Sequence, residues 1–361
     1  MQQKNKVLPI RVSLIRRKFS DYKVDSIIFF NMNNIRYFSG FTGSDGVLII
    51  NCGTAILLVD GRYSAQAALE VIDMQIIEYK DKIQGITQTI KDYNLKNIGF
   101  EADFLTVEMY NQLTKCLPNE VFVPLADELR LIRARKDETE IALMKKAAEI
   151  SSAAILSLIA QIKPGCTEKE LALQLELNAR KSGADQLAFE AIVAAGANSA
   201  LPHARPTDKK IKKGNLIVID FGVKCKGYCS DETCTIAFGE LTDKQKNAYQ
   251  TVQNAHDRAI AIIKANISAS AVDICARDAL GEKYRRYFVH GTGHGIGLEV
   301  HEAPRLASNS KDILDAQMVV TVEPGLYFPG LWGIRIEDTV LVKENGCEKI
   351  TKMDKDLVII E

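Results

Sequence analysis

The sequence predicts a two-domain protein of mixed α/β class. Its 361 residues are about two domains' worth of chain. Up to about Leu125, short apolar runs alternate with helical patterns, which is typical of an α/β domain. From Gly214 onward, paired strands, one further helix and a glycine-rich segment follow. We therefore expect one domain over residues 1–127 and a second, of α+β texture, over residues 128–361.

The first domain is expected to alternate strands and helices. Short apolar runs predict the strands, and apolar residues at helical spacing predict the helices. The expected strands are Asp25–Phe30, Gly46–Asn51, Thr54–Asp60, Asn97–Glu101 and Glu120–Val123, and the expected helices are Ala65–Val71 and Ile83–Asp92. The charged stretch Asp127–Glu138 then marks the boundary between the two domains.

The second domain is expected to begin with two helices. The first carries apolar residues at Ile141, Met144 and Ala148 and ends before Pro164 and Gly165. The second opens at Thr167, whose capping-box partner is Glu170. The later expected elements are strand Asn215–Val223, turn Cys225–Gly227, strand Tyr228–Phe238, helix Thr242–Asn266, and strands Met318–Val322 and Gly333–Lys343.

Charge and hydropathy exclude several functional classes. The chain has 46 basic and 46 acidic residues, so its formal net charge of zero argues against nucleic acid or an anionic membrane surface as partner. Its longest clean apolar runs, such as Val47–Asn51, are far shorter than the roughly 20 residues of a membrane span. The N-terminus lacks the apolar stretch of a signal peptide. We therefore expect a cytoplasmic protein whose eight cysteines are reduced.

Three of the five histidines fall within twelve positions of the glycine-rich segment Phe288–Glu302. They are His290, His294 and His301. Glycines permit close backbone approach, and imidazoles gather where metal or proton chemistry takes place. This segment is therefore a candidate site. The cysteine group Cys225, Cys229 and Cys234 lacks the spacing of a zinc knuckle, so these are expected to be structural thiols.

Two aspartates are expected to share one face of a strand pair. Asp220 ends the apolar run Leu216–Asp220, and Asp231 lies in the returning strand. A tight turn between the strands places Asp220 opposite either Asp231 or Thr233, and in both registers the two carboxylates lie on the same face. Buried carboxylates that close repel each other, so they need protons or cations between them.

A second strand pair shows the same feature. Glu323 ends the apolar run Val319–Val322, and the alternation of Gly333–Lys343 puts Arg335 and Glu337 on one face with Glu337 at the strand centre. The alternative is a salt bridge on the protein surface. Together, these carboxylates and an imidazole suit two oxygen-preferring divalent ions, Mn(II) first, with Co(II) or Zn(II) as alternatives. Two such ions would share bridging carboxylates and generate a hydroxide nucleophile.

At these residues the chain resembles the pita-bread metallopeptidases, which include methionine aminopeptidase, aminopeptidase P and prolidase. The strings Val-Ile-Asp-Phe-Gly, Ser-Asp-Glu-Thr, Gly-Thr-Gly-His-Gly-Ile-Gly-Leu, Val-Glu-Pro-Gly and Arg-Ile-Glu-Asp carry the resemblance. It implies a pita-bread catalytic domain with five metal ligands in the family order, which are Asp220, Asp231, His294, Glu323 and Glu337. It further implies that Asp231 and Glu337 bridge the ions, with Asp220 on one ion and His294 and Glu323 on the other.

The resemblance also implies roles for residues around the metal ligands. Glu323 would act as general base and then acid, and His301 would hydrogen-bond the scissile carbonyl. His203 and His290 would line the pocket, and Arg335 would orient the bridging carboxylates. His256 matches no family position, and we expect it on a helix surface.

The N-terminal domain narrows the expected activity. The segments Asn34–Gly46 and Val59–Tyr63 resemble the creatinase-type domain of aminopeptidase P, which methionine aminopeptidases generally lack. The resemblance implies a homodimeric enzyme that releases the N-terminal residue from peptides with proline second. Its alternative is a prolidase, limited to dipeptides, in which Arg305 would bind the substrate carboxylate. Two further alternatives share the fold but are not favoured. A hydrolase of creatine-like amidines lacks the metal ligands, and a non-catalytic binding module has lost them, whereas all five ligands are present here.

Overall fold

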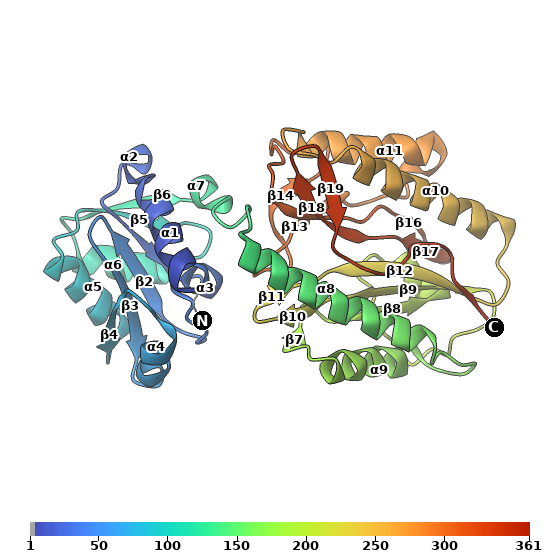
Figure 1. Cartoon of the computed structure of the whole chain (residues 1–361), viewed down its shortest axis with the longest axis horizontal. Helices are drawn as coiled ribbons and strands as arrows, with labels where there is room; N and C mark the ends of the chain where they lie inside the picture. Colours follow the sequence, from blue (N-terminus) through green and yellow to red (C-terminus); the bar gives the residue numbers. More distant parts are fainter. Residues whose placement is uncertain (1–3) are drawn as a thin grey trace. The chain divides into compact units, whose positions relative to one another are not determined.

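The computed structural model describes residues 4–361 and divides the chain into two compact units (Figure 1). The first unit ends at Ile132, and the second is Arg133–Glu361.

The first unit is built on a six-stranded mixed sheet with strand order β4-β3-β2-β1-β5-β6. β1, β2 and β3 pair antiparallel, whereas β3–β4, β1–β5 and β5–β6 are parallel. The strands are β1 Ser26–Phe29, β2 Val47–Asn51, β3 Ala55–Asp60, β4 Gln75–Tyr79, β5 Asn97–Glu101 and β6 Val121–Leu125. The strands and helices predicted for this part are present, with ends shifted by one or two residues. β4 was not predicted, because only one of its five residues is buried and the strand gives a weak apolar signal.

Helices cover the sheet of the first unit. Ile86 and Ile90 of α5 and Leu113 of α6 pack into the core on one face of the sheet. The helices are α1 Lys4–Arg16, α2 Phe19–Tyr22, α3 Met32–Ser39, α4 Ser64–Glu70, α5 Lys82–Asp92, α6 Val107–Cys116 and α7 Asp127–Arg130. α1, α2, α3, α6 and α7 were not predicted. Side-chain caps from Asn31 and Thr106 open α3 and α6.

The second unit contains two larger sheets. One has the order β20-β12-β9-β8 and the other the order β14-β13-β15-β18-β19. Two small sheets, β11-β10-β7 and β16-β17, complete it. The strands are β7 Gln186–Leu187, β8 Ile192–Ala195, β9 Asn215–Phe221, β10 Val223–Cys225, β11 Tyr228–Cys229, β12 Glu232–Phe238, β13 Gly293–Gly295, β14 Glu302–Leu306, β15 Val319–Val322, β16 Gly325–Phe328, β17 Trp332–Arg335, β18 Asp338–Lys343, β19 Gly346–Lys349 and β20 Ile359–Ile360.

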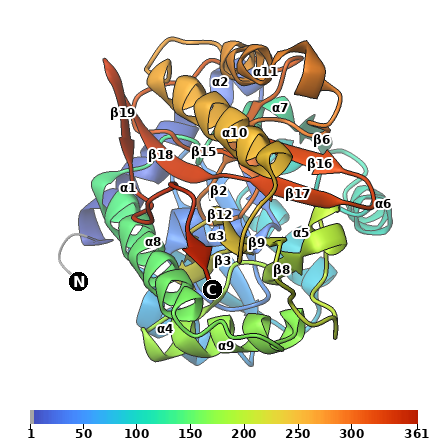
Figure 2. The ribbon, with the colours of Figure 1, turned by 90° about the vertical axis from the view of Figure 1, so that its right-hand side faces the viewer.

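Two pairs of long helices flank these sheets (Figure 2). α8 and α9 pack on the four-stranded sheet, and α10 and α11 pack against each other over the other side. The helices are α8 Glu138–Ile159, α9 Glu168–Lys181, the 3₁₀ helix η1 Gly196–Ala200, α10 Asp243–Ala261 and α11 Ala269–Arg285. The capping box predicted at Thr167 and Glu170 is confirmed.

Three of the predicted strands are interrupted. Asn215–Val223 is broken at Gly222 and becomes β9 and the start of β10. The chain leaves the strand geometry at Ser230 and Asp231, so Tyr228–Phe238 becomes β11 and β12. The prediction that Glu337 lies at a strand centre was wrong. The chain passes from the β16–β17 hairpin into the five-stranded sheet at this point, and Glu337 lies between β17 and β18.

His256 does not lie on the surface, so that prediction was also wrong. Its side chain on α10 is completely buried, with Nε2 3.3 Å from Asp338 Oδ2 and Nδ1 2.9 Å from Asp257 Oδ1. The polar sequence of α10 suggested an exposed helix, but the face that carries His256 packs onto the five-stranded sheet.

Candidate metal centre

The five predicted ligands come from two different sheets. Asp220 is in β9 and Asp231 directly precedes β12, so both belong to the four-stranded sheet. His294 is in β13, Glu323 directly follows β15, and Glu337 directly precedes β18, all at the five-stranded sheet. Thr233 pairs with Asp220 in the β9–β12 ladder, which is one of the two predicted registers.

The structure brings these side chains together. His294 Nε2 lies 3.4 Å from Glu323 Oε1 and 3.6 Å from Asp231 Oδ2. Ligand atoms of Asp231, His294 and Glu337 all lie within 4.8 Å of one another, which is close enough to hold a metal ion. Asp220 joins the group through Arg335, whose Nη2 forms an ion pair with Asp220 Oδ2.

The electrostatics of this cluster fit bound cations. Burial and then the neighbouring carboxylates raise the pKa of Asp231 and Glu323 well above the usual value, and that of Glu337 to about 8. Asp220 Oδ1 and Glu337 Oε1 are buried and have no hydrogen-bond partner among residues 4–361. Because buried carboxylate oxygens are normally satisfied, these atoms are available as ligands for divalent ions.

His294 has the protonation state that a metal ligand needs. Burial lowers the pKa of His294 to about 3, so its imidazole is neutral at physiological pH. Its Nδ1 lies 3.1 Å from the carbonyl oxygen of Gly295, which can only accept a hydrogen bond. Nδ1 therefore carries the proton, and the lone pair on Nε2 faces Asp231 and Glu323.

The glycines beside His294 allow the strands around it to approach closely. A Cβ atom on Gly293 would lie 1.9 Å from the carbonyl oxygen of Thr321 in β15. A Cβ on Gly295 would lie 2.2 Å from the carbonyl oxygen of Ala303 in β14. Neither position accepts a side chain without moving a neighbouring strand, which explains part of the glycine-rich pattern.

Arg335 connects the carboxylates to His290. Its Nη1 donates to the Tyr327 hydroxyl at 2.8 Å, and that hydroxyl lies 2.9 Å from His290 Nε2. Because His290 Nδ1 donates to the carbonyl oxygen of Gly291 at 2.8 Å, Nε2 is the acceptor and Tyr327 the donor. Burial lowers the pKa of His290 to about 4, so this hydrogen-bond chain holds a neutral imidazole.

Two further predicted residues lie on exposed segments beside the centre. The ring of His301 is 4.3 Å from that of His294, and burial lowers the pKa of His301. His203 is exposed on the segment that follows η1. That segment is tied to the centre, because the carbonyl oxygen of Pro202 accepts a hydrogen bond from Arg335 Nη1 at 3.2 Å.

Arg305 lies directly opposite His294 in the β13–β14 pair and is exposed. Paired residues of neighbouring strands project their side chains to the same face of the sheet. The structure therefore puts the Arg305 guanidinium on the face of the sheet that carries the candidate metal ligands.

Sequence reasoning missed three residues that organise the site. Thr233 Oγ1 donates to Glu337 Oε2 at 2.6 Å, and Tyr327 links Arg335 to His290 as described above. Glu168 is a buried carboxylate of α9 that accepts hydrogen bonds from Ala195 N, Asn198 Nδ2 and Thr207 N at 2.7, 2.8 and 2.8 Å. Glu168 therefore holds both ends of the segment that carries His203. In the sequence, Glu168 stands out by its position directly after the helix cap Thr167. Acidic residues are common in the first turn of a helix, so this position does not indicate a role in a site.

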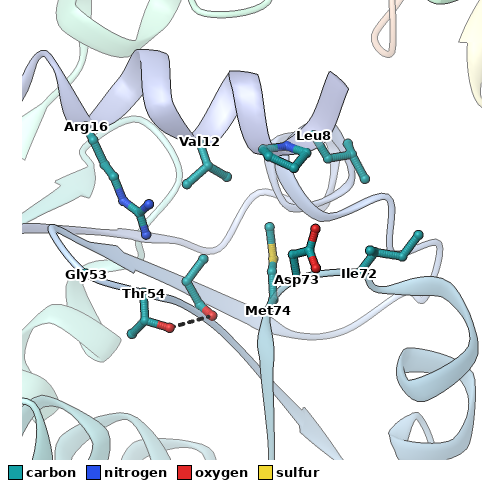
Figure 3. A pocket seen from close by; sticks show the side chains of 10 residues that line it. Leu8, Val12, Arg16, Gly53, Thr54, Ile72, Asp73 and Met74 are labelled. Carbon is teal, nitrogen blue, oxygen red and sulfur yellow. Dashed lines mark hydrogen bonds between the residues drawn. The ribbon is translucent and has the colours of Figure 1, made fainter. Parts of the chain in front are cut away.

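A cavity in the first unit is separate from these residues. It has a volume of about 250 Å³ and lies between α1, the β2–β3 turn and the segment before β4 (Figure 3). Its lining includes Leu8, Val12, Arg16, Asp73 and Met74 and none of the predicted site residues. Arg16 Nε donates a hydrogen bond to the carbonyl oxygen of Asn51 at 2.7 Å.

Among residues 4–361, no helix is long and apolar enough to cross a membrane.

The fold and the site together define a candidate metal centre between two sheets, preceded by a separate α/β domain. Comparison with known families agrees. Residues 142–344 match metallopeptidase family M24, and residues 11–135 match the Creatinase/Prolidase N-terminal domain. The chain belongs to metallopeptidase family M24. The expected class, a creatinase-like α/β domain followed by a pita-bread catalytic domain, is confirmed.

Similar proteins carry two different names. The structure of an Xaa-Pro dipeptidase from Bacillus anthracis is 39% identical, with a TM-score of 0.95, and covers 98% of this chain and 100% of that one. That of an X-Pro aminopeptidase from Thermotoga maritima is 39% identical, with a TM-score of 0.88 and coverage of 95% and 100%. An Xaa-Pro dipeptidase from Pyrococcus furiosus is 36% identical over 94% of this chain and 97% of its own.

Proposed function

We propose that the protein hydrolyses the peptide bond that precedes a proline, using two divalent metal ions held by Asp220, Asp231, His294, Glu323 and Glu337. The convergence of these side chains, with buried carboxylate oxygens that lack partners, carries the proposal. The names of the relatives support the proline specificity. Four carboxylates and one imidazole form a donor set rich in oxygen, which favours Mn(II) over softer ions.

The protein side chains perform the remaining work of the reaction. When bound, the ions supply Lewis acidity to the scissile carbonyl and lower the pKa of water. The carboxylate of Glu323 accepts the proton of the attacking water and delivers it to the proline nitrogen as the bond breaks. His301 donates a hydrogen bond to the carbonyl oxygen as charge develops there. Burial keeps His290 neutral, and the hydrogen-bond chain from Arg335 through Tyr327 fixes its orientation.

We propose a dipeptide as the preferred substrate. The relatives with either name match this chain over nearly its whole length, so the N-terminal domain does not separate a dipeptidase from an aminopeptidase. The position of Arg305 supports the dipeptide. Its guanidinium shares a face with His294, where it would form a charge-assisted bond to the free carboxylate of an Xaa-Pro dipeptide. The aminopeptidase is the second candidate, which the Thermotoga maritima structure favours.

A hydrolysis panel with Mn(II) tests this function. The substrates are an Xaa-Pro dipeptide, an Xaa-Pro-Xaa tripeptide and a longer Xaa-Pro peptide. We expect the dipeptide to be cleaved best, and Arg305→Ala to lower its kcat/KM by about 10–100-fold, the effect of a lost charge-assisted bond. Arg180→Ala, on the exposed face of α9, is the control and should change nothing.

The panel also decides between the two candidates. Efficient cleavage of the longer peptide, with little effect of Arg305→Ala on it, would establish the aminopeptidase instead. Absence of Xaa-Pro cleavage in Mn(II), Co(II) and Zn(II) alike would refute the proposed function. We further propose that the enzyme works as a cytoplasmic homodimer, which light scattering of the purified protein and cell fractionation will test.

A further inference from the structure

A second cluster of charged groups lies behind the metal centre. Glu232 follows Asp231 in the chain, and Asp338 follows Glu337. Successive side chains of extended backbone point to opposite sides. Asp231 and Glu337 point into the centre, so Glu232 and Asp338 point away from it. The side chains of Glu232 and Asp338 are 0% and 1% exposed, so both carboxylates are buried.

Lys355 lies between these two carboxylates. Its Nζ donates to Glu232 Oε1 at 2.7 Å and lies 3.5 Å from Asp338 Oδ1, and its side chain is only 4% exposed. Burial alone would lower the pKa of Lys355, but the charges of Glu232 and Asp338 raise it above its usual value. Lys355 is therefore a buried cation that contacts both anions.

Other hydrogen bonds and charged contacts anchor the cluster to α8, α10, β19 and the segment between β19 and Lys355. Two partners of Glu232 come from α8 and from the chain just before Lys355, and the partners of Asp338 come from α10, β19 and the segment after β19. The distances are 2.6 Å from Ser152 Oγ and 3.3 Å from Met353 N to Glu232, and 2.6 Å from Thr351 Oγ1, 2.8 Å from Lys349 Nζ and 3.3 Å from His256 Nε2 to Asp338.

The cluster matters because it joins two sheets. Glu232 begins β12 of the four-stranded sheet, and Asp338 begins β18 of the five-stranded sheet, and these two strands share no ladder. Hydrogen bonds that connect them directly are Glu337 N to Thr233 O at 3.1 Å, Thr233 Oγ1 to Glu337 Oε2 at 2.6 Å, and Thr339 Oγ1 to Asp231 O at 2.7 Å. Two residues before Glu337, Arg335 also exchanges hydrogen bonds with Thr233 and Thr235 of β12. The spacing of Asp231 and Glu337 therefore depends on these bonds and on what holds the strand starts together.

We propose that Lys355 is a positioning residue for the metal centre: by pairing with Glu232 and Asp338, it holds the starts of β12 and β18 at the separation at which Asp231 and Glu337 bind metal. This inference rests on the proposed function, because it takes Asp231 and Glu337 as metal ligands. It assigns a role in metal binding to the last part of the chain, whose residues touch none of the ligands themselves.

The test measures Mn(II) binding by calorimetry on metal-free full-length protein, together with kcat and KM for an Xaa-Pro dipeptide. Lys355→Met keeps the length of the side chain and removes its charge. We expect it to weaken Mn(II) binding by about 10–100-fold, as other losses around metal ligands do, and to lower kcat with little change in KM. Lys355→Arg retains the cation and should restore most of the Mn(II) affinity.

Lys136→Met is the matched control. Lys136 is 1% exposed and pairs at 2.7 Å with Glu302, which follows His301 rather than a predicted metal ligand. This variant loses an equally buried ion pair, yet we expect its Mn(II) affinity to stay at the wild-type value. If Lys136→Met lost as much Mn(II) affinity as Lys355→Met, the effect would be a general loss of stability and the proposal would be wrong.

The remaining outcomes are also decisive. Wild-type Mn(II) affinity and kcat in folded Lys355→Met would overturn the proposed role while leaving the proposed function intact. A wild-type protein that neither binds Mn(II) nor cleaves Xaa-Pro would instead remove the proposed function and this inference with it. If Lys355→Met does not fold, Thr351→Val removes one bond to Asp338 at little cost in shape. It should then weaken Mn(II) binding several-fold, and unchanged binding would overturn the proposal.

Discussion

Raising the pH should destabilise the metal-free second unit. Burial raises the pKa of Glu337 from 4.5 to about 8, so the folded state retains a proton that the unfolded state releases. A group with a raised pKa contributes stability at low pH and loses it as the pH rises through the folded-state value. Between pH 7 and pH 8, Glu337 alone should lower the free energy of unfolding by about 1 kcal/mol.

The window between pH 7 and pH 8 isolates the carboxylates. Asp231 and Glu323 also have a raised pKa and act in the same direction. The lowered pKa values of His290 and His294 act in the opposite direction, because these groups lose stability as the pH falls below about 6.5. Above pH 7 both histidines are neutral in the folded and unfolded states and contribute little.

The assay is urea unfolding followed by tryptophan fluorescence. The single tryptophan of the chain, Trp332, is in β17 of the second unit and packs 4.3 Å from the ring of Phe328, so it reports on that unit. Unfolding is measured at pH 7 and pH 8, with chelator or with saturating Mn(II). Glu337→Gln, a neutral side chain of the same size, is the control and should show a smaller loss between the two pH values in chelator.

Two results would refute this reasoning. One is a metal-free wild type whose free energy of unfolding stays constant or rises from pH 7 to pH 8. The other is a fall of the same size in saturating Mn(II), because bound cations stabilise the ionised carboxylates and should remove it.

Three further outcomes are expected. His301→Ala should lower kcat by about 10²–10³-fold for dipeptides and longer peptides alike, the typical cost of a lost hydrogen bond to a developing oxyanion, and steady-state kinetics on both substrates checks this. Glu168→Gln should cost about 1–3 kcal/mol of stability, seen in urea unfolding, and should lower kcat/KM, because one amide oxygen cannot accept all the bonds that now hold the His203 segment. Dialysis against chelator should abolish turnover, and titration with Mn(II) should restore it near two equivalents per chain.

Local patterns predicted much of the fold and the candidate ligands. The capping box at Thr167 and the register that places Thr233 opposite Asp220 depend on residues close together in the chain. Asp220 and Glu323 each end a run of apolar residues, and His294 sits among glycines, where a polar side chain is conspicuous. Such features are visible in sequence because strand alternation and helix capping depend on neighbouring residues.

The division between the two sheets could not be predicted in the same way. The alternation of apolar and polar residues covers Ile334 to Glu337 and stops at Asp338, close to the point where β17, which pairs with β16, gives way to β18, which pairs with β15. Alternation reports which side chains share a face, but it does not identify the partner strand. The pattern therefore does not reveal that the chain passes from one sheet to another at Glu337.

The supporting polar residues were missed for a related reason. Lys355 and its partner Glu232 are 123 residues apart in the chain. A buried lysine and a surface lysine look the same in a single sequence, because burial is set by contacts with distant segments. The burial of His256 was missed for the same reason. Its helix α10 is polar in sequence, but it packs against Asp338 of the five-stranded sheet.

The placement of the ligands on two sheets explains why a costly cluster of carboxylates can persist. Buried anions that share a site repel each other, so in the metal-free protein they oppose the contact between the sheets. Bound divalent ions would replace this repulsion by attraction, because each carboxylate is then attracted to a cation that its neighbours also bind. On the opposite side of the strands, Lys355 neutralises the repulsion between Glu232 and Asp338. This cation is part of the chain, so the pairing is permanent. On the proposed function, the strand starts are held by Lys355 on one side and by exchangeable metal ions on the other, so metal binding and the packing of the two sheets should be coupled.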